Sequence, residues 1–414
     1  MNKAKLTGIA LAASAAVLAA APAISQGGAA PVARYTIDAG TMSGMAAMSA
    51  GGGVGGVLGA LGGGGSQVAH ELVLRLGSSR AATGEPQADH FMPAGARLGA
   101  SVPLVTPRAA PTGPSGSQPS FPQGQLPQGR LLIFWGCGEH APAGQPVVVD
   151  FSRLARGEMP AGLMAQSLNL PDEWQIDAGN SRTYGEWPNQ RDSQRVPANA
   201  SLLGAHRIVG NYAPEIAFDL ADDFMPALRP ATSDLASGGI GLGWNGIAQA
   251  TGYYAWAMGA GAGNDSRDMV MWSSSSSQQT GGFMGGSLSG WLSPAAVGRL
   301  VDAGTVMPPS QTTCAIPAEV KAAAGPGMMI NLNAYGPEAD FAYPPRPAAA
   351  RAAWKPEWTA RVRFRSNVML IPGMPGFGDD GDGGQANAGQ ADAPKKPRCR
   401  GLRGIAERAA GLCE

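Results

Sequence analysis

The stretch RLLIFWGCGEH, from Arg130 to His140, brings together the most reactive residue types in the chain. A run of apolar residues ends in Cys137, Glu139 and His140, which stand among glycines. A thiol, a carboxylate and an imidazole are groups used in nucleophilic catalysis and in metal binding. The alternative interpretation is the tight end of a strand that carries a structural cysteine.

The spacing favours the structural interpretation. Glu139 and His140 are adjacent, so on a strand their side chains point to opposite faces. No Cys-x-x-Cys pair is present, and the other three histidines stand apart in the sequence. As a nucleophile, Cys137 would need a base such as His140 or His206 beside it. The sequence also lacks a nucleophile elbow, a phosphate loop and a dinucleotide fingerprint, so we expect no cofactor.

Four cysteines are present in the chain, and they are Cys137, Cys314, Cys399 and Cys413. An even count in an exported protein favours disulfides, and four cysteines allow three pairings. Pairing Cys399 with Cys413 would leave Cys137 to bond Cys314. If residues 399–413 were one helix, its ends would lie about 21 Å apart, whereas bridged Cα atoms lie roughly 4.4–6.8 Å apart. That local pair therefore needs a bent tail, or the tail cysteines pair elsewhere.

The first residues predict export. Lys3 and Lys5 precede an uncharged run from Leu6 to Ala23, and small residues follow up to Ser25. This pattern is typical of a secretory signal peptide, predicted here over residues 1–25, with a retained anchor as the alternative. We expect a bacterial periplasmic or secreted protein without a transmembrane anchor after cleavage.

Composition and patterning predict a mainly β chain of two β-sandwich-like domains with short helices and long flexible Gly/Pro-rich segments. There are 30 basic and 30 acidic residues, so the chain lacks the excess of basic residues that is typical of nucleic-acid-binding proteins. In order, the predicted segments are a Gly/Met-rich tether at 26–66, a β domain at 67–158 with a Pro-rich loop at 108–129, an irregular linker at 159–198, a second β domain at 199–372, an acidic Gly-rich linker at 373–398 and a basic tail at 399–414.

Two elements carry the clearest local signals. Residues 293–304 predict a short helix, with Ser293 as its N-cap and Gly304 after its end. Residues 358–370 alternate as a strand that places Arg361, Arg363 and Arg365 on one face. The sequence favours a solvated outer face for these arginines, and an anion-binding stripe is the alternative.

Residues 130–136 and 145–151 are expected to pair as antiparallel strands.

One segment resembles a known module. Trp244 ends an apolar run, and Ala250-Thr251-Gly252-Tyr253 begins the next. Over about residues 238–276 this resembles the second and third strands of fibronectin type III-like sandwiches. The resemblance implies a β-sandwich, a fold that adhesins, receptors and accessory modules share, so it implies no particular function.

Two further residue sets are candidates for binding. Met42, Met45 and Met48 have a spacing at which thioethers can hold Cu(I), although methionines in a loose apolar segment look the same. Among nine tryptophans, four lie beside charged residues and prolines and are expected near the surface, where they could stack on sugars or grip a protein. These four are Trp174, Trp187, Trp354 and Trp358.

The sequence therefore favours a non-catalytic binding or structural protein of the envelope, in contact with glycan or with another envelope protein. The alternatives are a periplasmic hydrolase or redox enzyme centred on Cys137, Glu139 and His140, and copper handling by the three methionines.

Overall fold

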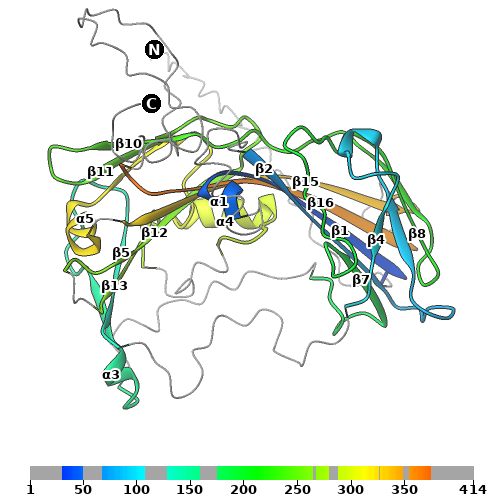
Figure 1. Cartoon of the computed structure of the whole chain (residues 1–414), viewed down its shortest axis with the longest axis horizontal. Coiled ribbons are helices and arrows are strands. Elements are labelled where there is room, and N and C mark those ends of the chain that lie inside the picture. Colours follow the sequence, from blue (N-terminus) through cyan, green and yellow to red (C-terminus); the bar gives the residue numbers. More distant parts are fainter. Residues whose placement is uncertain are drawn as a thin grey trace, which may run out of the picture. The chain divides into compact units, whose positions relative to one another are not determined.

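The computed structural model describes eight stretches of the chain, all within one compact unit, Met1–Asp379. They are residues 30–49, 68–107, 128–158, 175–263, 267–278, 288–325, 327–347 and 354–373. Within these stretches the chain is mainly β, with three sheets and a few short helices (Figure 1). The predicted mainly β, sandwich-like class is confirmed.

The largest sheet has nine strands and mixes parallel and antiparallel pairs. In spatial order its strands are β6 (Val147–Asp150), β5 (Arg130–Trp135), β13 (Met269–Ser273), β12 (Gly252–Ala260), β15 (Met329–Tyr343), β16 (Trp358–Leu370), β1 (Ala33–Gly44), β2 (Val68–Ser78) and β7 (Thr183–Trp187). The expected antiparallel pairing of the segments around β5 and β6 is confirmed.

Two smaller sheets and the short helices complete the described part of the chain. The four-stranded sheet has the order β4 (Val102–Leu104), β3 (Ala88–Phe91), β8 (Gly204–Gly210) and β9 (Ile216–Leu220). The three-stranded sheet has the order β10 (Pro230–Asp234), β11 (Ile240–Trp244) and β14 (Thr313–Ile316). The helices are α1 (Met45–Ser49), the 3-10 turn η1 (Ala94–Ala96), α3 (Phe151–Leu154), α4 (Pro294–Asp302) and α5 (Ala318–Ala324). In the described ranges, none of them is both long and apolar enough to cross a bilayer.

The main core lies on one face of the nine-stranded sheet and joins all three sheets. On β1, Tyr35 and Ile37 point to this face, because strand side chains alternate. They share one apolar cluster with Ile208 of β8, Ile216 of β9 and Ile316 of β14. The two small sheets therefore form the second layer of the sandwich-like arrangement.

Helix α4 packs on β12 and β15 within a second, smaller cluster. Val297 and Leu300 of the helix join Tyr254 of β12 and Tyr335 of β15 in this cluster. Ser293 accepts a hydrogen bond from the backbone N–H of Ala296, so the predicted N-cap is confirmed. Gly304 has a positive φ of 68° directly after the helix, which is the conformation that glycine favours.

The tether predicted at 26–66 is wrong for residues 33–44, because these residues form β1 inside the nine-stranded sheet. Figure 1 shows β1 in blue beside the orange β16. β1 pairs in parallel with β16 and antiparallel with β2 over its whole length. Its small residues carry little intrinsic strand preference, so pairing to two neighbours determines its conformation.

The predicted division into two β domains also differs from the structure. Strands from both predicted domains, such as β5 from 67–158 and β13 from 199–372, pair within one sheet. The linker predicted at 159–198 contains β7, which pairs with β2 at the sheet edge. Long-range pairing of this kind leaves no local signal in the sequence.

The position of β1 leads to a stability prediction. Ile37→Ala should lower the free energy of unfolding by about 2–5 kcal/mol, the usual cost of truncating a fully buried aliphatic side chain. Val148→Ala, at a side chain that is 41% exposed, should change it by less than about 0.5 kcal/mol. Chemical denaturation measures both values. An unaffected Ile37→Ala protein would support a tether and contradict the observed strand.

Candidate functional site

The GCGEH corner is a cross-link. Cys137 forms a disulfide with Cys314 of β14, with the two Cα atoms 5.1 Å apart and a sequence separation of 177. Cys314 is buried among the core residues. The sulfur of Cys137 is therefore bonded, and it is not a thiolate available for attack. The expected disulfide is confirmed, and of the pairings that the sequence left open the structure forms Cys137–Cys314. Cys399 and Cys413 lie outside the described residues.

Polar contacts hold the rest of the corner to the start of α5. The backbone N–H of Gly138 donates to the carbonyl of Ala315, and that of Ala318 donates to the carbonyl of Glu139. The carboxylate of Glu319 accepts from the N–H of Ala141 at 2.8 Å and contacts Nδ1 of His140 at 3.1 Å. These contacts lower the pKa of Glu319, chiefly through the backbone hydrogen bond from Ala141.

The GCGEH corner therefore attaches the end of β5 to β14 and α5. His140 is engaged by Glu319, and no cysteine–imidazole pair forms there. Across the described ranges, no group of three or more His, Cys, Asp or Glu side chains could hold a metal ion.

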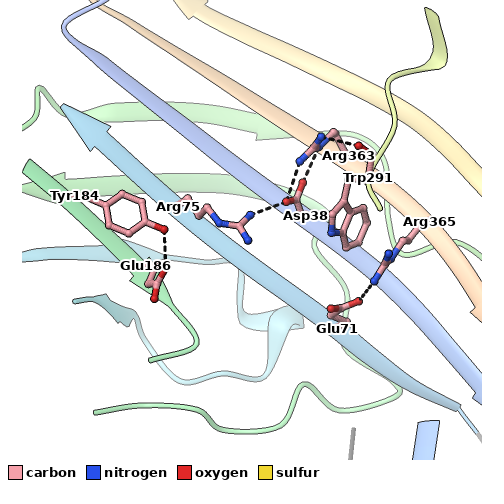
Figure 2. Close-up of polar contacts among 8 residues, drawn as sticks. All are labelled: Asp38, Glu71, Arg75, Tyr184, Glu186, Trp291, Arg363 and Arg365. Carbon is pink, nitrogen blue, oxygen red and sulfur yellow. Dashed lines mark hydrogen bonds and ion pairs between the residues drawn. The ribbon is translucent and has the colours of Figure 1, made fainter. Parts of the chain in front are cut away.

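A group of charged side chains lies on the sheet face opposite the main core, because Asp38 alternates with the core residues Ile37 and Ala39 on β1. Figure 2 shows this group. The carboxylate of Asp38 on β1 is fully buried. Arg363 on β16 donates to both of its oxygens, at 2.7 and 3.0 Å, and Arg75 on β2 donates to Oδ2 at 2.9 Å. We call these three residues the Asp38 network. A buried carboxylate needs such partners, since an unpaired charge away from water is strongly unfavourable.

A second ion pair and a tryptophan lie beside the network. Arg365 donates to Glu71 at 2.6 Å, and its guanidinium lies 4.1 Å above the ring of Trp291. The carbonyl of Trp291 accepts from Arg363 at 3.0 Å. A Cβ on Gly40 would meet the Trp291 ring at 3.2 Å and Glu71 at 3.1 Å. A glycine at this position of β1 therefore makes room for the ring to lie against the strand.

The third arginine of β16 faces two acidic residues of β15. Arg361 contacts Glu338 at 3.2 Å and Asp340 at 3.3 Å. Burial raises the pKa of Glu338 to about 7, opposed by the charge of Arg361 and reinforced by Asp340. Oε2 of Glu338 is buried and has no hydrogen-bond partner among the described residues, which agrees with a carboxyl group that is partly protonated near neutral pH.

The solvated outer face expected for the three arginines is therefore wrong, and the structure does not provide an anion-binding stripe either. Arg361, Arg363 and Arg365 have side chains that are 12%, 16% and 15% exposed. Each pairs with a carboxylate from the same sheet, so the face neutralises its own charge. The alternation signal identified the arginines, but their acidic partners lie on other strands.

A chain of hydrogen bonds links three buried rings between the large sheet and the four-stranded sheet. The hydroxyl of Tyr35 lies 2.7 Å from Nδ1 of His90. Nε2 of His90 lies 3.0 Å from Nδ1 of His206, and Nε2 of His206 lies 2.7 Å from the carbonyl of Leu202. All three rings are at most 1% exposed.

One arrangement of protons satisfies the whole chain. The Leu202 carbonyl can only accept, so Nε2 of His206 carries its proton and Nδ1 accepts. Nε2 of His90 then donates to His206, and the Tyr35 hydroxyl donates to Nδ1 of His90. In this arrangement both imidazoles are neutral Nε2–H tautomers, and an added proton would place a positive charge at a buried site. Burial accordingly lowers the pKa of both histidines.

The tryptophans predicted as binding residues have different environments. Trp187 is 1% exposed and Trp358 is 6% exposed, so the surface position predicted for these two is wrong. Both belong to strands whose core faces are covered. Trp174 lies outside the described residues. Of these four tryptophans, Trp354 alone is partly exposed in the described ranges.

Trp354 belongs to a surface group at the end of the β15–β16 hairpin, which we call the Tyr343 patch. It consists of Tyr343, Arg346, Trp354 and Lys355. Tyr343 is 56% exposed and stacks on Trp358, with ring centroids 6.4 Å apart. Nε1 of Trp354 donates to the carbonyl of Pro344, and the guanidinium of Arg346 lies 5.5 Å above the Trp354 ring. The sequence analysis missed Tyr343; the Tyr-Pro-Pro-Arg-Pro run around it is the signal that could have found it.

The three methionines lie on β1 and α1. Met42 is on β1, and Met45 and Met48 are on α1. All three side chains are partly buried. Nothing in these positions favours copper over apolar packing, so Cu(I) binding stays a prediction.

Comparisons with protein-family models, with curated proteins and with solved structures found no match to this chain. The fibronectin-like resemblance therefore stays a prediction. Its two strands, β11 and β12, lie in different sheets, and the rings of Trp244 and Tyr253 are 5.4 Å apart.

The Asp38 network leads to a stability prediction. Asp38→Ala should lower the free energy of unfolding by about 3–5 kcal/mol, because it leaves two guanidinium groups without their carboxylate. Asp340→Ala removes a carboxylate whose side chain is 57% exposed, and it should cost less than about 1 kcal/mol. Urea denaturation of both variants provides the comparison. Equal, small losses would mean that Asp38 does not organise the sheet.

The buried histidines predict a loss of stability in acid. The pKa values of His70, His90 and His206 are lowered by burial, so the unfolded chain binds more protons below about pH 6.5. Their contribution to stability is present above that pH and falls as the pH drops towards the folded pKa values. Glu338 acts oppositely, since its raised pKa adds stability in acid that is lost as the pH rises through about 7.

Glu338→Gln removes this opposing effect. The free energy of unfolding of that variant should fall between about pH 7.5 and about pH 5.5. Wild-type protein, which keeps Glu338, is the control and should show a smaller fall. Denaturation at several pH values measures the slope. A flat or reversed slope would contradict the assignment of neutral, buried imidazoles.

Proposed function

We propose that this chain is an exported protein of the bacterial envelope with a non-catalytic role, binding or structural, in contact with envelope glycan or another envelope protein. The observation that carries the proposal is the Cys137–Cys314 disulfide. Disulfides persist mainly in oxidising compartments such as the periplasm, and the amino-terminal pattern of charged, apolar and small residues agrees with that location.

The same cross-link weighs against the enzyme alternative. A hydrolase or redox enzyme centred on Cys137, Glu139 and His140 would need a reactive thiol beside its base. Here the sulfur joins the end of β5 to β14, and the imidazole contacts Glu319. The Tyr343 patch adds support for binding, since exposed aromatic rings with nearby cations are typical of recognition surfaces.

Fractionation and cysteine mapping test the proposal. The full chain, expressed in a Gram-negative host, should be recovered from the periplasm without residues 1–25. Its non-reducing peptide map should contain a Cys137–Cys314 link, and the folded protein should not react with a thiol label at either position. The control is the same protein made in the cytoplasm without the leader. Its Cys137 and Cys314 should stay reduced and should react with the thiol label.

Removing the bridge should also have a thermodynamic effect. Cys137→Ala together with Cys314→Ala should lower the free energy of unfolding by about 2–5 kcal/mol, because a long loop is no longer constrained. Retention of the leader in the cytoplasm, with both thiols free in the folded wild-type protein, would overturn the proposed export and role.

A further inference from the structure

The Tyr343 patch has the features of a ligand platform that the sheet holds in place. The carbonyl of Tyr343 accepts from the N–H of Glu357, whose own carbonyl accepts from Val32 and Ala33 at the start of β1. Trp358, directly opposite Tyr343 in the β15–β16 register, is buried and supports one side of its ring. The backbone and one ring face of Tyr343 are therefore held by the sheet. Its side chain is nevertheless the most exposed large hydrophobic one in the described ranges.

A second ring stands on the same hairpin. Trp354 lies four residues before Trp358 in the sequence, and its hydrogen bond to the carbonyl of Pro344 holds it in place. Two anchored aromatic rings at a surface suit a ligand with flat apolar faces, and pyranose rings stack on aromatic side chains in this way. Because both rings are held in place before binding, little conformational entropy is lost when a ligand docks.

The charges around the rings are mostly positive. Arg346 and Lys355 are exposed, and Arg80, with a side chain 54% exposed, lies at the rim. The acidic group that the structure places there is Glu357, at 4.0 Å from Arg80. Among the described residues of this region, three basic groups against one acidic group give a local positive charge, although the whole chain is neutral. This contrasts with Arg361, Arg363 and Arg365 of β16, each of which pairs with a carboxylate of the same sheet.

We propose that the Tyr343 patch binds an anionic glycan, with Tyr343 and Trp354 stacking on sugar rings and Arg346 and Lys355 pairing with carboxylate or sulfate groups. This inference rests on the proposed binding role in the envelope and names its ligand class. Charge complementarity favours an acidic glycan over a neutral one, because the described basic groups at the patch outnumber the described acidic ones.

Two polymers that share one backbone provide the test. The purified, disulfide-bonded protein is titrated with oligomers of polygalacturonate and with their methyl esters, which lack the charge. We expect binding to the acid form at low salt, weaker binding as salt rises, and at least about tenfold weaker binding to the ester, equivalent to about 1.4 kcal/mol. Calorimetry or intrinsic tryptophan fluorescence reports the affinity.

Substitutions then locate the site. Tyr343→Ala should weaken binding of the acid form at least about tenfold, and Arg346→Gln should reduce both the affinity and its salt dependence. Leu203→Ala, at a side chain that is 48% exposed directly before β8, is the matched control and should bind as wild type. Unfolding curves verify that each variant is folded, which the exposure of Tyr343 and Arg346 favours.

Each other outcome overturns the inference in a distinct way. Equal affinity for the acid and its ester would exclude an anionic ligand while leaving a neutral glycan site in place. Acid binding that Tyr343→Ala and Arg346→Gln leave unchanged would move the site elsewhere. Absence of binding to either polymer would reject the patch as a glycan site. The export and cysteine-mapping experiments do not depend on any of these three outcomes. A wrong ligand class can therefore be distinguished from a wrong proposed function.

Discussion

The large sheet depends on the burial of one carboxylate. Asp38 lies on β1 between β2 and β16, and guanidinium groups from both neighbouring strands donate to it. A carboxylate removed from water without such partners would be strongly unfavourable, so β1 takes this position only with Arg75 and Arg363 in place. The interaction ties residues near both ends of the described chain into one register.

This constraint explains why the two faces of the sheet differ. One face carries Tyr35, Ile37 and their apolar neighbours and packs on the two small sheets. The other carries arginines and acidic residues that pair with each other, with Trp291 lying against Gly40. A face that neutralises its own charge has little left to offer a ligand. In the described ranges, the most exposed large hydrophobic side chain, Tyr343, lies instead at the end of the β15–β16 hairpin.

The disulfide and the hairpin patch depend on the same framework. The Cys137–Cys314 bond joins the strand end after β5 to the three-stranded sheet, so it couples two layers of the sandwich-like arrangement. Tyr343 keeps its position through backbone hydrogen bonds that reach the start of β1. A stable sheet and an oxidised bridge would both serve the proposed binding surface, and the bridge agrees with the proposed location outside the cytoplasm.

Local patterns in the sequence determined the strand at 358–370, the helix from Ser293 and the side of the strand on which Arg361, Arg363 and Arg365 lie, because each signal depends on neighbouring residues. An even number of cysteines indicated bridges, but only the fold brought Cys137 within reach of Cys314. Tertiary structure alone decided that β1 is a central strand, that Trp187 is buried and that Tyr343 is exposed. Those outcomes arise from pairing between distant segments, and burial depends on which segments meet rather than on the residues beside a position.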